Sequence, residues 1–130
     1  AEVADADDVA ALVRSWSPDA VLTTGDNNYN VGGADTIEAN IGSRYREFFT
    51  PTSNGELRFI PTLGNHDWET ASAQPYLDYF NLPGNERYWD IGRGPVRIYC
   101  VDSDTREPDG TTATSVQGQW LERQRSISRS

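Results

Sequence analysis

Apolar residues recur along this chain with spacings that change several times, and each spacing predicts a different element. From Asp5 to Trp16 they return every three or four positions, which predicts a helix, and the Ser-Pro-Asp turn at 17–19 ends it. Residues 20–26, AVLTTGD, form a short β-rich run that ends in Gly-Asp. A second helix is expected from about Asp35 to Phe49, and a second strand from Leu57 to Leu63, again followed by Gly and polar residues.

The second half of the chain predicts a short helix, a hairpin and a last helix. Residues 74–84, QPYLDYFNLPG, are typical of a short helix that Pro-Gly stops. Residues 87–104, RYWDIGRGPVRIYCVDSD, are expected to form two strands joined through Gly-Arg-Gly-Pro. A loop follows over 106–115, and Ser115 is the expected N-cap of the final helix. Helix, strand and polar loop follow one another as in an α/β protein, and no internal repeat is present.

Length and charge limit the classes of protein to consider. A chain of 130 residues is large enough for one hydrophobic core, and no apolar stretch approaches the ~18 residues that span a bilayer. The net charge of −9 opposes binding to nucleic acid or to an anionic membrane, so neither is expected as a partner. The acidity suits cation binding, although a solvated acidic surface is the commoner explanation. The acidic start, AEVADADDVA, is unlike a signal peptide, so we expect a processed product or a fragment.

Two residue types exclude further chemistry. All eleven basic residues are arginine, so there is no lysine for a phosphate-binding loop or a Schiff base. The one cysteine, Cys100, can form no internal disulfide, and its neighbours RIYCVD alternate as in a strand. We therefore expect a buried, inert thiol rather than a nucleophile.

Polar side chains follow both of the first two predicted strands. In open α/β sheets ligands bind beyond the carboxyl ends of the strands, and here the segments GDNNY and GNHD stand at these ends. A glycine in each segment lets the backbone turn sharply. Carboxylate, amide, phenol and imidazole groups together suit a metal ion that activates water. The side chains expected to project from this edge are Asp26, Asn27, Tyr29, Asn65, His66 and Asp67.

Each segment also has an ordinary explanation. Asp and Asn after a strand are typical of turns, and a lone histidine is more often a surface residue than a catalyst. Trp68 is either a border of a pocket or a packing residue. A structural α/β domain with coincidental turns is therefore one alternative, but the chain's one histidine, His66, stands between Asn and Asp at a strand end, and this combination favours function.

Together, GDNNY and GNHD resemble the second and third signature blocks of the calcineurin-like metallophosphoesterases. The tyrosine makes the first segment a Gly-Asp-x-x-Tyr block, which is similar to that of the purple acid phosphatase branch of the superfamily. Three further segments are similar to sequences of the same branch: FIPTLGNHDW, YFNLPGNERYWDIGRGPVRIYCVDSD and QWLERQ. The resemblance spans Val9 to Gln124. It implies an α/β fold of layered type, an α/β/β/α sandwich, and a metal-dependent phosphoesterase acting on a small phosphorylated substrate.

The resemblance also implies roles for five residues. Asp26 would bridge two metal ions, Tyr29 would bind iron as a phenolate, and Asn65 would bind the second ion through its side-chain oxygen. His66 would act beside the phosphate as a proton donor or charge stabiliser, and Asp67 would orient its imidazole. The implied cofactors are iron plus iron, zinc or manganese, and the implied mechanism is in-line attack by a metal-bound hydroxide.

Other signature blocks of the superfamily have no counterpart here. An opening strand with an aspartate should precede Asp5, and three histidines should follow the final helix, whereas His66 has no companion. We therefore expect residues 1–130 to form a partial domain, incomplete at both ends and inactive alone. The alternative is an inactive truncated paralogue that binds a metal ion or phosphate. The residues do not indicate a location, and export is suggested by the resemblance alone.

Overall fold

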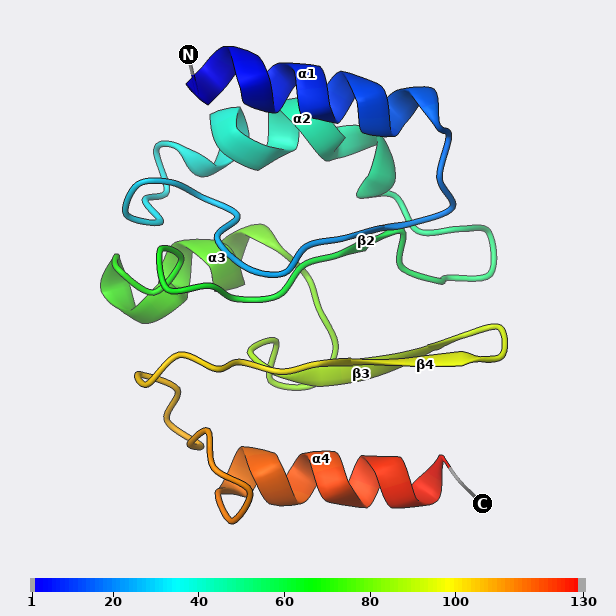
Figure 1. Cartoon of the computed structure of the whole chain (residues 1–130), viewed down its shortest axis with the longest axis vertical. Helices are drawn as coiled ribbons and strands as arrows, with labels where there is room; N and C mark the ends of the chain where they lie inside the picture. The colour runs from blue at the N-terminus through cyan, green and yellow to red at the C-terminus, as the bar shows by residue number, and fades with distance from the viewer. Residues whose placement is uncertain (1, 129–130) are drawn as a thin grey trace.

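The computed structural model describes residues 2–128, with side chains from residue 5 onward, and combines helices with two small sheets (Figure 1). None of the helices in this described range is long and apolar enough to cross a membrane. In chain order the elements are α1 (Glu2–Ser15), β1 (Val21–Leu22), η1 (Glu38–Gly42), α2 (Ser43–Tyr45), η2 (Arg46–Phe48), β2 (Phe59–Ile60), η3 (Ala71–Ala73), α3 (Gln74–Tyr79), β3 (Trp89–Arg93), β4 (Val96–Cys100) and α4 (Val116–Ile127).

The arrangement places helices at both ends and the strands between them. Figure 1 shows α1 and α2 together at one end, then β1 and β2 with α3, then β3 and β4, and α4 at the opposite end. The segments that follow β1, β2 and β4 all lie on the same side of the molecule, at the left of this view. Loops from three different strands therefore meet on one side.

The first sheet pairs β1 with β2 in parallel, with Val21 opposite Phe59 and Leu22 opposite Ile60. The helical segment η1–α2–η2 makes the crossover that a parallel pair requires. Thr62 extends the pairing past the strands, because its Oγ1 donates to the Thr23 carbonyl oxygen at 2.8 Å. Both predicted strands exist, but the ladder has only two residues on each side because the chains turn away at the glycines that follow.

The hairpin and the last helix were predicted correctly. Strands β3 and β4 pair in antiparallel fashion, with Trp89 opposite Cys100, and turn at Gly94-Pro95. Ser115 caps α4, since its hydroxyl oxygen accepts a hydrogen bond from the Gly118 N–H at 3.1 Å. Cys100 is buried, as expected, and burial raises the pKa of its thiol to about 11, which disfavours the reactive thiolate.

The helix expected from Asp35 to Phe49 is real but irregular. It consists of a π turn, an α turn and a 3₁₀ turn in succession, η1, α2 and η2. A Cβ on Gly42 would lie 2.1 Å from the Tyr79 hydroxyl oxygen, so α3 packs closely against this segment and a larger residue there would displace the Tyr79 side chain. The buried Ile37, Ile41 and Phe48 still face the core, where Phe80, directly after α3, packs against rings of β2 and of α3.

The stripe of apolar residues on α1 faces outward in the described structure. Val9, Leu12 and Trp16 are 56%, 52% and 67% exposed, whereas Ala10 is fully buried. Helical spacing predicted the element correctly, but it gave no information on which side of the helix the rest of the chain covers.

Candidate functional site

Two glycines bring the loops after β1 and β2 into contact. Gly25 has a φ of +103°, and a Cβ there would lie 2.9 Å from the Gly64 Cα. A Cβ on Gly64 would lie 2.1 Å from the Asp26 backbone nitrogen. Backbone atoms cannot yield as the end of a flexible side chain can, so glycine is required in both positions. The two turns, residues 25–30 and 64–68, therefore form one unit.

Three side chains at the outer face of this unit contact one another. The Tyr29 hydroxyl donates to Asp26 Oδ2 at 3.0 Å, and Asp26 Oδ1 accepts from the His66 backbone N–H at 3.1 Å. The Tyr29 and His66 rings lie with their centroids 4.5 Å apart. His66 Nδ1 forms a hydrogen bond with the Asn30 carbonyl oxygen. The structure thus brings together Asp26, Tyr29 and His66, as the sequence predicted for this edge.

Tyr29 is protonated in this arrangement. The hydrogen bond to Asp26 raises the pKa of its phenol, and burial and the negative charges of Asp26 and Asp67 raise it further. A cation bound to both groups would have to displace this hydrogen bond and the phenolic proton. A strongly Lewis-acidic ion can do so, because its charge reverses the electrostatic effect on the phenol.

Asp67 lies beneath the outer face and is 1% exposed. Its Oδ2 accepts from the Gly64 N–H at 3.0 Å and from both the backbone and side-chain N–H of Asn27 at 3.1 Å. Its Oδ1 accepts from the Asn28 N–H at 3.1 Å. Burial raises the pKa of the Asp67 carboxyl, while these four N–H groups oppose the rise.

This contact pattern differs from the expected role of Asp67. We expected its carboxylate to orient the His66 imidazole, but its hydrogen bonds go to the two turns, and the imidazole is bonded to Asn30 instead. The physical reason is direction: the chain turns between His66 and Asp67, so one side chain lies at the surface and the next one lies inside. Asp67 joins the two turns to each other.

Asn27 and Asn28 also point inward. Asn27, expected to project from the edge, is 5% exposed and donates to the Thr62 carbonyl oxygen at 2.7 Å. Asn28 is 1% exposed and donates to the Gly33 carbonyl oxygen at 2.7 Å. Its Oδ1 accepts from Thr36 at 2.8 Å and from Asn40 at 2.9 Å. Both asparagines therefore form hydrogen bonds with buried polar groups of the loop. Residue type alone could not distinguish this structural role from ligand binding.

Asn65 is exposed beside His66, and its side-chain amide has no hydrogen-bond partner among the described residues. Its carbonyl oxygen accepts from Arg106 Nη2 at 2.8 Å. Trp68, next to Asp67, is buried and donates through Nε1 to Asp102 Oδ2 at 2.9 Å, so it is a packing residue.

The sequence interpretation missed the third loop. Asp102 and Arg106 follow β4 and contact the turn 64–68, and Asp104 between them holds the Arg106 guanidinium. VDSD, residues 101–104, is a third polar segment at a strand end, and this signal was available.

The oxygen donors at the outer face are of the types that bind hard cations. Asp26 and Tyr29 are already 3.0 Å apart through their oxygens, and carboxylate, phenol and amide oxygens are ligands of hard and Lewis-acidic ions. Among the described residues, no group of three or more His, Cys, Asp and Glu side chains is arranged to hold a metal ion. The residues that could contribute to a metal site are therefore Asp26, Tyr29 and Asn65.

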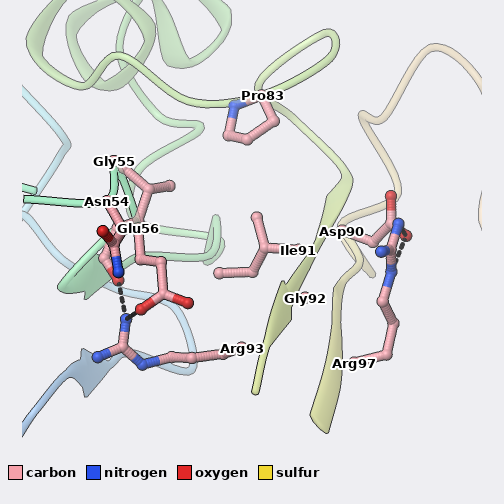
Figure 2. Close-up of a pocket in the computed structure, with 10 residues that line it drawn as sticks. Asn54, Gly55, Glu56, Pro83, Asp90, Ile91, Gly92, Arg93 and Arg97 are labelled. Atoms are coloured by element: carbon pink, nitrogen blue, oxygen red, sulfur yellow. Dashed lines mark hydrogen bonds and ion pairs between the residues drawn. The ribbon is translucent and has the colours of Figure 1, made fainter. Parts of the chain in front are cut away.

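A polar cleft of about 310 Å³ lies elsewhere, between the turn before β2 and the β3–β4 hairpin (Figure 2). Its charged groups are paired with one another. Arg93 contacts Glu56 at 3.7 Å and donates to the Leu57 carbonyl oxygen, and Arg97 donates to Asp90 at 2.7 Å. None of the residues lining this cleft belongs to the two turns, so it is separate from the candidate site.

Comparison with known proteins identifies the family of this chain. A family model for calcineurin-like phosphoesterases matches residues 3–126. The chain therefore belongs to the calcineurin-like phosphoesterase family, whose fold is of the α/β metallophosphoesterase type. Searches of curated proteins and of solved structures found no match. The family comprises metal-dependent hydrolases of phosphate esters, and its members generally bind two divalent metal ions.

Proposed function

We propose that the two turns after β1 and β2 are the metal-binding edge of a phosphoesterase of the purple acid phosphatase-like branch. The observation that carries this proposal is the contact of Tyr29 with Asp26 Oδ2 while Asp26 Oδ1 accepts from the His66 N–H. One carboxylate is thereby placed between the phenol of one turn and the backbone of the other. The finer fold expectation, an α/β/β/α sandwich incomplete at both ends, is part of the same proposal.

Each outer residue has a role in this proposal. Asp26 would contribute to both metal ions, Tyr29 to one and Asn65 to the other. Bound ions, iron with iron, zinc or manganese, would neutralise phosphate charge and lower the pKa of a water molecule. His66 lies beside Tyr29, and its Nδ1–H donates to the Asn30 carbonyl oxygen, so the imidazolium form would carry the second proton on Nε2 and could give it to the leaving oxygen of a small phosphorylated substrate. Asp67 is a positioning residue, since it fixes both turns.

Metal titration of Asp26 variants tests the role of this carboxylate. We expect calorimetry with Mn²⁺ to show binding to the unaltered chain, and Asp26→Asn to weaken it about tenfold or more. Asp78→Asn is the matched control, because Asp78 is an exposed carboxylate on α3 that contacts only Gln74 at 2.7 Å within the described residues. Equal affinities of the Asp26 and Asp78 variants would refute the proposed site.

Iron loading tests the phenolate and the branch. An iron(III)-loaded chain should show a visible charge-transfer band that Tyr29→Phe abolishes. Tyr99→Phe is the control, since the Tyr99 hydroxyl contacts Ser128, directly after α4, instead. Iron bound without a visible band would contradict the purple acid phosphatase-like assignment and leave the wider family unaffected.

A second candidate function is an inactive module that holds one cation or a phosphate group. It is favoured by the small number of ionisable ligands: no cluster of three or more occurs in the part of the chain that the structure describes. Stoichiometry separates the two candidates. In a version of the chain extended at both ends, two tight Mn²⁺ equivalents with hydrolysis of p-nitrophenyl phosphate support the enzyme, whereas one weak equivalent without turnover supports the module.

A further inference from the structure

The loop between β4 and α4, residues 101–115, grips the turn 64–68 at two points. Arg106 Nη2 donates to the Asn65 carbonyl oxygen at 2.8 Å, near the start of the turn. At its end, the Trp68 indole N–H donates to Asp102 Oδ2 at 2.9 Å. Two separate contacts on one five-residue turn restrict both its position and its rotation.

The Arg106 guanidinium is itself fixed by carboxylates. Its Nε and Nη2 donate to Asp104 Oδ1 and Oδ2, both at 2.8 Å, in the two-bonded geometry that suits arginine. Its Nη1 lies 3.3 Å from Glu69 Oε1, just beyond the turn. The Asp104 side chain is only 8% exposed. The arginine therefore reaches Asn65 from a rigid base.

The two grips form one connected network. The Asp104 backbone N–H donates to Asp102 Oδ1 at 2.9 Å, which joins the Arg106 end to the Trp68 end. Asp102 is in turn held by α4, since Gln117 accepts from its N–H at 2.8 Å and donates to its carbonyl oxygen at 2.9 Å. The position of the turn is thus linked to a regular helix.

We propose that Arg106 and Asp102 are positioning residues that hold Asn65 in the orientation required of a metal ligand. The metal in this inference comes from the proposed function, whereas the two hydrogen bonds that hold the turn 64–68 do not depend on that function. The Asn65 side chain is exposed and has no hydrogen-bond partner of its own in the described chain, so the structure fixes only its Cα–Cβ direction, which the backbone sets. That backbone is held by Arg106. Groups that orient a ligand in this way typically change metal affinity 10–100-fold when they are removed.

Substitution of Arg106 tests the proposal without endangering the fold. The residue is partly exposed, and ion pairs at such positions contribute little to stability. We expect Arg106→Gln to leave the unfolding midpoint almost unchanged, to weaken Mn²⁺ binding about tenfold in calorimetry, and to speed hydrogen exchange of the His66 amide. Arg106→Lys keeps the charge but not the planar fork, so it should resemble Arg106→Gln.

Arg125→Gln is the matched control. Arg125 pairs with Glu122 at 3.4 Å on α4, at similar exposure, and should change neither Mn²⁺ affinity nor exchange. Full rescue by Arg106→Lys would overturn the proposal, because charge rather than geometry would then act. Faster exchange of the His66 amide with unchanged Mn²⁺ affinity would also overturn the proposal, since Arg106 would then hold the turn without affecting metal binding.

The same experiment separates this inference from the proposed function. If the unaltered chain binds no Mn²⁺, the proposed function fails, and the proposal that Asn65 is held as a ligand fails with it. Faster His66 exchange in Arg106→Gln would then still show that the loop holds the turn. Unchanged affinity and unchanged exchange, with Mn²⁺ bound, would contradict the positioning role alone.

Discussion

The two turns that follow β1 and β2 have similar sequences and use their residues in opposite ways. In the first turn the carboxylate Asp26 is half-buried at the outer face, and the amide Asn28 is fully buried. In the second turn the amide Asn65 lies at the surface and the carboxylate Asp67 is buried. Each turn thus presents one oxygen donor outward and uses the other to satisfy backbone groups.

The difference teaches that residue type alone does not distinguish a ligand from a structural anchor. Buried Asp67 accepts four N–H groups, and buried Asn28 both donates and accepts. Each is the type of group that its surroundings require, since a carboxylate only accepts and an amide does both. Substitutions can test this division between outer and inner residues.

The largest expected effect is steric. Gly64→Ala would place a Cβ 2.1 Å from the Asp26 backbone nitrogen and 2.3 Å from Asp26 Oδ1, so the two turns must separate. We expect a loss of about 3 kcal/mol or more in the free energy of unfolding, measured by urea titration. Gly92→Ala is the control, because its nearest atom would be Arg97 Nη1 at 3.6 Å. A loss as small as that of the control would contradict the close approach.

Asp67→Asn should be nearly as harmful, although it changes one atom. An amide NH₂ in place of either oxygen would face the N–H groups of Asn27 or Asn28. We expect a loss of about 3 kcal/mol in unfolding free energy, because buried donors lose a charged acceptor. The outer carboxylate gives the contrast: Asp26→Asn should cost less than about 1 kcal/mol. If Asp26 and Asp67 variants were equally stable, the division into outer and inner carboxylates would be wrong.

The Asp102 carboxyl group, which accepts the hydrogen bond of Trp68, should make the stability of the fold depend on pH. Burial, and then the neighbouring Glu107, raise the pKa of Asp102 to about 6 from 3.8. A carboxyl group whose pKa is higher in the folded state stabilises the fold below about pH 4, and this contribution is lost as pH rises through about 6.

We expect this loss to amount to about 2 kcal/mol, as the difference between the unaltered chain and Asp102→Asn in urea unfolding from pH 4 to pH 7. The comparison cancels the titrating groups that do not interact with Asp102, whereas Glu107 contributes to the difference because it interacts with Asp102. A difference that stays constant over this range would show that Asp102 keeps an ordinary pKa.

The two asparagines give the smallest and sharpest contrast. Asn28→Ala should cost about 1–2 kcal/mol, because the Gly33 carbonyl, the Thr36 hydroxyl and Asn40 lose their partner. Asn65→Ala should change unfolding free energy by less than about 0.5 kcal/mol, since its side chain is exposed. Thermal unfolding of both variants, with and without Mn²⁺, measures this. Mn²⁺ should raise the unfolding temperature of Asn28→Ala, which keeps Asn65, but not that of Asn65→Ala. An equal Mn²⁺ effect in both variants would remove Asn65 from the proposed ligands.

Sequence patterns predicted the helices and strands better than they predicted the contacts between distant segments. The hairpin through Gly94-Pro95 and the helix capped by Ser115 were predictable because turn and cap residues act on their immediate neighbours. The site edge was predictable too, since glycine followed by polar residues at a strand end is a local signal. The polar segment that contains Asp102 was visible at a strand end but was missed, and the partners of Asp102 and Arg106 could not be found because their contacts with Trp68 and Asn65 join segments more than 30 residues apart.

The amino-acid sequence by itself determined the family, the strand-end motifs and the chemistry that their residue types allow. Spacing and residue type suffice for these properties because both are written locally in the chain. The tertiary structure decided which of six polar side chains face outward, and it turned Asn27 and Asp67 inward to bind backbone N–H and carbonyl groups. Burial of a polar group requires partners from other segments, and only the folded chain brings those partners together.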